Sequence, residues 1–105
     1  MSTDYQIVFC TCPDKDTAEK IASLLVENKV AACVNIVPNI TSIYRWQGQL
    51  ERAEEVLLLI KARQDTYSAL ESLIKKHHPY QLPEIIAVAI ERGLPDYLNW
   101  IASCH

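Results

Sequence analysis

The sequence predicts a single α+β domain over residues 1–105, a ferredoxin-like βαββαβ sandwich with a long protruding hairpin and a C-terminal helix. Two observations predict this fold. Four strand-like segments alternate with two amphipathic helices in that order, and a chain of 105 residues has material for one core. Because crossover connections are right-handed, we expect the fourth, first, third and second strands to be neighbours in that order, with both main helices on one face.

The first strand and the first helix are predicted over residues 5–12 and from residue 13 to about Asn28. The strand segment, YQIVFCTC, is rich in β-branched and aromatic side chains, and it is expected to be buried on both faces. The helix segment repeats apolar residues every three or four positions, and Asp16 with Glu19 resembles a capping box at its start.

The second and third strands are predicted over residues 30–46, with an interruption at 38–39, and over residues 50–62. Gly48 lies in the turn between them and suits a positive φ. At about 3.3 Å per residue, each strand spans roughly 40 Å, about twice the length of the first and fourth strands. Much of this hairpin must therefore project beyond the sheet with bare edges. Soluble proteins rarely leave such edges exposed, so we expect them to pair with other subunits in a closed cyclic oligomer.

The second helix is predicted to run from residue 65 or 68 to about residue 77, the last strand over 84–90, and a short helix after residue 95. The connector HHPYQLPE at 77–84 holds two of the three histidines and two of the five prolines. In the predicted topology the end of the first strand lies beside the start of the fourth, and the second helix ends on the same side.

The topology therefore brings the thiols of Cys10 and Cys12 toward His77 and His78. Thiolate and imidazole together suit Cu(I), Cu(II) or Zn(II) rather than Mg²⁺ or Ca²⁺. Adjacent residues do not share a face, so the two histidines are not expected to bind one ion together. On the residues alone, a second interpretation stays open, in which one histidine caps the helix C-terminus and the other is solvated.

Charge and composition argue against several classes of partner. The net charge of −3 and the pI near 5.5 give no general attraction to nucleic acid or to an anionic membrane. The aromatic and basic pattern of RNA-binding sheets is absent, because the third strand instead carries Glu51, Glu54 and Glu55. A nucleophilic Cys–His pair would need an orienting group and an oxyanion site, which no motif marks, so we expect no enzyme activity.

The cellular setting is expected to be the cytoplasm. The N-terminal residues lack a positive region followed by an apolar stretch, so we expect no signal peptide, and no apolar run approaches the roughly 20 residues of a membrane span. The four cysteines form no C-x-x-C pair and are expected to be reduced. Cys33 is predicted to be a buried small hydrophobe and Cys104 to lie on an exposed tail.

Five motifs occur in an order that resembles the CutA family of divalent-cation tolerance proteins, from Val8 to Trp100: FCTCPD, KVAACVNIVP, SIYRWQGQLE, HHPYQLPEI and DYLNW. The resemblance implies a cytoplasmic, non-catalytic homotrimer with a ferredoxin-like fold, similar in architecture to the PII signal-transduction proteins. It also implies binding of copper, or of another divalent cation such as zinc, and a role in the response to metal ions.

The metal positions of that family map onto Cys10, His77 and His78, whereas Cys12 is an additional thiol. A second hypothesis remains open. In it the chain is a PII-like sensor that binds an anionic metabolite in clefts between subunits, with Lys61 and Arg63 as candidate anion partners.

Overall fold

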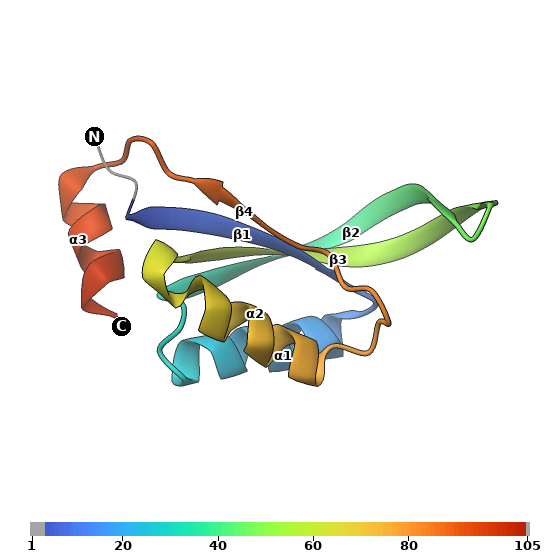
Figure 1. Ribbon diagram of the computed structural model, residues 1–105, viewed down its shortest axis with the longest axis horizontal. Coiled ribbons are helices and arrows are strands. Elements are labelled where there is room, and N and C mark those ends of the chain that lie inside the picture. Colours follow the sequence, from blue (N-terminus) through green and yellow to red (C-terminus); the bar gives the residue numbers. More distant parts are fainter. Residues whose placement is uncertain (1–3, 105) are drawn as a thin grey trace.

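The computed structural model describes residues 4–104 as a four-stranded antiparallel sheet with two main helices against one face (Figure 1). The strands are β1 (Tyr5–Cys12), β2 (Cys33–Trp46), β3 (Gln49–Arg63) and β4 (Ile85–Ala89). The helices are α1 (Lys15–Glu27), α2 (Tyr67–His77) and α3 (Pro95–Ser103), with a 3-10 turn, η1 (Gln64–Thr66), before α2. The sheet order β2-β3-β1-β4 confirms the predicted topology. No helix within residues 4–104 is long and apolar enough to cross a membrane.

The core lies between the sheet and helices α1 and α2. Alternate residues of β1, including Val8, Cys10 and Cys12, face the helices and are buried, as are Leu58 and Ile60 of β3. The predicted burial of both faces of β1 is wrong for the protomer. Buried and half-buried residues alternate from Tyr5 to Cys10, and the half-buried Ile7 and Phe9 face away from α1 and α2. Near the end of the strand Thr11 is buried as well.

The N-cap of helix α1 lies two residues before the predicted capping box. Asp14 is the N-cap, and its Oδ1 accepts a hydrogen bond from the Thr17 backbone N–H at 2.8 Å, so the cap formed by Asp16 and Glu19 is wrong. The helix ends at Glu27, with Asn28 as its C-cap. The φ of 60° at Lys29 then turns the chain, and β2 starts at Cys33 rather than at residue 30. Cys33 is half-buried rather than buried.

Replacing Asp14 by Ala is expected to lower stability at neutral pH, while the Asp14→Asn variant keeps most of it. The hydrogen bonds from Thr17 hold the pKa of Asp14 below its ordinary value of 3.8. Because the native pKa is depressed, this stability is fully present above the ordinary value and is lost as the pH falls through the native one. Denaturant unfolding at pH 7 and pH 3 should therefore show a smaller gap between wild type and Asp14→Ala at pH 3. A gap that does not change with pH would contradict the charged cap.

The long hairpin projects as predicted. Only residues from Val56 onward in β3 pair with β1, whereas the part from Gln49 to Glu55 pairs with β2 alone. Positive φ values at Gln47 (51°) and Gly48 (80°) form the turn. The interruption predicted at residues 38–39 is a shift in register between Val37 and Ile40.

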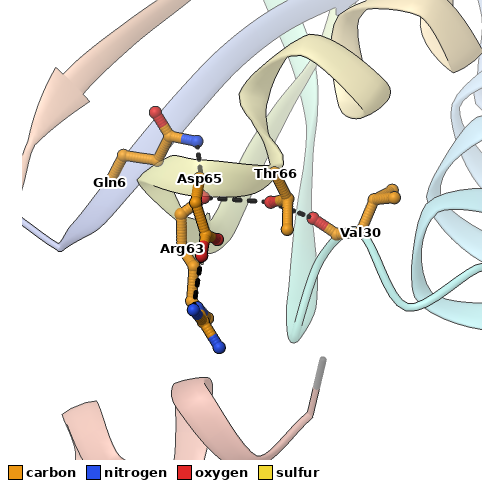
Figure 2. Close-up of polar contacts among 5 residues, drawn as sticks. All are labelled: Gln6, Val30, Arg63, Asp65 and Thr66. Atoms are coloured by element: carbon orange, nitrogen blue, oxygen red, sulfur yellow. Dashed lines mark hydrogen bonds and ion pairs between the residues drawn. The ribbon is translucent and has the colours of Figure 1, made fainter.

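A small polar network fixes the corner from β3 into α2 (Figure 2). Thr66 Oγ1 donates to the carbonyl oxygens of Val30, at 3.0 Å, and Arg63, at 2.9 Å. The Arg63 carbonyl also accepts from Gln6 Nε2, at 2.9 Å, and the Arg63 guanidinium pairs with Asp65. These bonds tie β1, β3 and the α1–β2 loop together, and so they set the direction in which α2 leaves the sheet.

Candidate metal site

The candidate site lies where the end of β1 meets the end of α2. Cys10 and Cys12 stand two residues apart on β1, so both thiols point to the helix side of the sheet, and neither residue exposes any surface. His78 follows α2 directly and is also buried. The two Sγ atoms and one ring nitrogen of His78 all lie within 4.8 Å of one another. In Figure 1 the connector from α2 to β4 passes beside the end of β1, where this cluster lies.

Both ring nitrogens of His78 already have hydrogen-bond partners. Nε2 lies 2.8 Å from the Thr11 carbonyl oxygen, and Nδ1 lies 3.1 Å from the Tyr80 backbone nitrogen. A carbonyl oxygen only accepts and a backbone N–H only donates, so these bonds fix the neutral tautomer with the proton on Nε2. For His78 to bind a metal ion, one ring nitrogen must exchange its hydrogen bond for the metal.

His77 does not join the cluster. It is the last residue of α2 and is half-buried, in a final turn that also carries Lys75 and Lys76. Cationic or polar side chains there complement the helix dipole. The structure therefore brings Cys10 and His78 together, adds Cys12 to them, and leaves His77 outside.

The hydrogen bond between the two thiols shifts their pKa values in opposite directions. The hydrogen bond with Cys12 raises the pKa of Cys10 above its ordinary value, and burial raises it further. The hydrogen bond from Cys10 lowers the pKa of Cys12, against the opposing effects of burial and of the charges on Asp14 and Glu55.

A buried carboxylate lies next to the cluster. The Tyr80 hydroxyl donates a hydrogen bond to Glu55 Oε2 at 2.6 Å, and the Tyr80 ring packs on the His78 ring with centroids 4.7 Å apart. Burial, followed by the hydrogen bond to Glu55, raises the pKa of Tyr80 above its ordinary value. The phenol therefore stays protonated as the donor that satisfies Glu55, which is 8% exposed.

A groove of about 620 Å³ opens beside the same residues, between residues 42–46 of the hairpin strand β2 and residues 80–84. Thr11 and Tyr80 line it from the side of the metal site. Among the described residues that line it, Glu55 and Glu84 are acidic and Arg45 is the cation. The two cations suggested from the sequence as anion partners do not line this groove. Lys61 donates to Asn35 Oδ1, and Arg63 pairs with Asp65.

The family model described as CutA1 divalent ion tolerance protein matches residues 6–104. The chain belongs to the CutA1 family. It is 48% identical over 101 residues to a "Protein CutA homolog" of Xenopus laevis, covering 96% of this chain and 67% of that relative. It is also 46% identical over 96 residues to the "Divalent-cation tolerance protein CutA" of Thermus thermophilus, covering 91% of this chain and 93% of the relative. Among the vertebrate relatives, the chain spans from about half to two thirds of their length.

Solved CutA structures share the fold. The crystal structure of CutA from Xylella fastidiosa superposes with a TM-score of 0.94 at 44% identity, covering 96% of this chain and 97% of that one. The ferredoxin-like fold and the CutA resemblance predicted from the sequence are thereby confirmed.

Sequence reasoning did not assign a role to Cys12 or find the contact between Glu55 and Tyr80. A usable signal existed for Cys12, because residues i and i+2 of a strand share a face. No local signal existed for Glu55 and Tyr80, which are 25 residues apart and meet through the tertiary fold.

Proposed function

We propose that this chain is a cytoplasmic, non-catalytic metal-binding protein of the divalent-cation tolerance type, which holds copper, or another divalent cation such as zinc, at Cys10 and His78. The observation that carries the proposal is the cluster of two thiols and an imidazole nitrogen within 4.8 Å of one another. Sulfur and imidazole nitrogen are the donors that copper and zinc prefer. Of the two histidines that the family resemblance implies, the proposal assigns His78 to the ion and leaves His77 out, because only His78 belongs to the cluster. Four free cysteines suit a reducing compartment.

We also propose that the protein is a homotrimer, joined through the open sheet face and the hairpin strands. The face opposite the helices carries apolar side chains from adjacent strands. Ile86 and Val88 of β4 are 55% and 54% exposed, and they lie in register with Phe9 and Ile7 of β1. Apolar side chains exposed together on a sheet face are typical of a surface that another subunit covers. The hairpin adds Ile43, which is 68% exposed.

The alternative function, a PII-like sensor of an anionic metabolite, has the groove in its favour. This concave surface offers a ligand one cation, Arg45, and three aromatic rings, those of Tyr44, Trp46 and Tyr80. The carboxylates of Glu55 and Glu84 in the same groove repel an anion. Calorimetry against a panel of nucleotides and organic anions tests this alternative. Binding at micromolar concentration would favour this alternative, and the absence of binding to every compound of the panel would count against it.

Copper binding under reducing conditions tests the main proposal. We expect the Cys10→Ala and His78→Ala variants to lose at least about tenfold in affinity, measured by competition with a chromogenic chelator, because each loses a ligand. The His77→Ala variant should stay close to wild type. Cys33→Ala is a matched control, because it removes a thiol that lies outside the cluster. If Cys10→Ala and His78→Ala, shown to be folded by circular dichroism, bind copper as tightly as wild type, the site is wrong.

A further inference from the structure

We propose that Cys12 is a metal ligand and that it pairs with Cys10 as a buried two-thiolate site for a soft monovalent cation, Cu(I). This inference rests on the proposed function, since it specifies the ion and adds a ligand at the same site. It goes beyond that function because neither the proposed ligand set of Cys10 and His78 nor the family's metal positions include Cys12.

The strand geometry places the two sulfurs close enough together for one ion to bind both. Cys10 and Cys12 lie opposite Leu58 and Val56 of β3, in unbroken antiparallel register, so the backbone holds both side chains on one face. Their Sγ atoms lie no more than 4.8 Å apart. Two metal–thiolate bonds of about 2.3 Å span at most roughly 4.6 Å, when they are collinear, and less when they are bent. An ion can thus sit between the sulfurs without a break in the β1–β3 pairing.

The surroundings favour an ion that accepts few ligands. Cys10 and Cys12 have no exposed surface and belong to the apolar core cluster, so solvent outside the protein does not reach the space between them. The next donor is His78, which can add a nitrogen only by giving up a hydrogen bond to Thr11 or Tyr80. Zn²⁺ takes four ligands in structural sites, and this cluster supplies at most three. Cu(I) is stable with two sulfurs, or with two sulfurs and one nitrogen, and thiolates select it.

The binding step is balanced without any change of oxidation state. Two S–H bonds break, two S–Cu bonds form, two protons leave to solvent, and the copper remains Cu(I). The groove beside the cluster carries negative charge. Thr11 lies between the two cysteines in sequence, with its side chain on the opposite face of the strand, and it lines the groove together with Glu55 and Glu84, whose carboxylates attract cations.

The test is an anaerobic titration of the full chain with Cu(I) buffered by a competing chromogenic chelator, together with X-ray absorption at the copper edge. We expect Cys12→Ala to weaken Cu(I) binding by at least about tenfold. Ala keeps the site apolar, so the variant tests the ligand rather than a buried polar group. Cys33→Ala should bind as wild type does. The absorption spectrum of the wild-type protein should show two sulfurs on copper, and that of Cys12→Ala one.

The outcomes separate this inference from the proposed function. If Cys12→Ala binds Cu(I) within twofold of wild type while Cys10→Ala does not, Cys12 is no ligand and the proposed function stands. If both variants bind as wild type does, both proposals are wrong. If Cys12→Ala does not fold, the sulfur count on copper in the wild-type protein decides alone, and one sulfur would overturn the inference.

Discussion

Placing a carboxylate on the open face of the sheet is expected to convert the assembled protein to a monomer. In the variant carrying Ile86→Asp and Val88→Asp, two apolar side chains that are 55% and 54% exposed in the protomer become charged. Each contributes up to about 1.5–3 kcal/mol when it is fully covered. A buried unpaired carboxylate costs several kcal/mol more. In a cyclic trimer the lost apolar burial and the cost of the buried carboxylates occur in every subunit. Their sum is therefore larger than the free energy that holds an ordinary interface together.

Sedimentation velocity at micromolar concentration measures this effect. Wild type should sediment as a trimer and the double variant as a monomer, with the helix content of both unchanged. Ala87→Asp is the matched control. It lies on the same strand but on the opposite face, in register with Val8, and it is exposed in the protomer. A wild-type protein that sediments as a stable monomer would refute the trimer, as would a double variant that remains trimeric.

The topology could be predicted from the sequence because it depends on features that a single chain displays. Strand period, helix period and the length of the hairpin fixed the order of elements, and the handedness of crossovers placed the end of β1 beside the connector at residues 77–84. The meeting of Cys10 with His78 follows from that placement. The N-cap of α1 could not be predicted from the sequence. Asp14 and Asp16 are both suitable N-cap residues, and the choice between them depends on where the chain turns.

The choice between the two histidines was predictable in part. Pro79 disfavours the helical conformation in the residue before it, and His78 accordingly has φ −85° and ψ 135°, whereas His77 remains in the helix. His78 therefore does not continue the helix, and its ring forms hydrogen bonds with the Thr11 carbonyl oxygen and the Tyr80 backbone N–H. No sequence period shows such partners, because they depend on how the connector lies against β1.

Removing the hydrogen bond between Tyr80 and Glu55 is expected to lower the free energy of unfolding measurably. Tyr80→Phe removes the hydroxyl that donates to the buried Glu55 carboxylate at 2.6 Å. Leaving a buried acceptor unsatisfied costs about 1–3 kcal/mol. We expect denaturant unfolding at pH 7 to show a loss of that size. The Glu55→Gln variant in the Tyr80→Phe background should recover part of it, because a neutral amide is easier to bury than a carboxylate.

The same contact predicts a dependence on alkaline pH. The pKa of Tyr80 is raised in the native state, first by burial and then by the Glu55 hydrogen bond. The native state then holds this proton more tightly than the unfolded state does. The stabilisation is fully present below about pH 10, the ordinary pKa of tyrosine, and it is lost as the pH rises through the native pKa. The difference in unfolding free energy between wild type and Tyr80→Phe should consequently shrink above about pH 10. A difference that stays constant or widens would show that the Tyr80 hydroxyl is not the hydrogen-bond donor to Glu55. The contribution of Tyr80 to stability would then come from the packing of its ring alone.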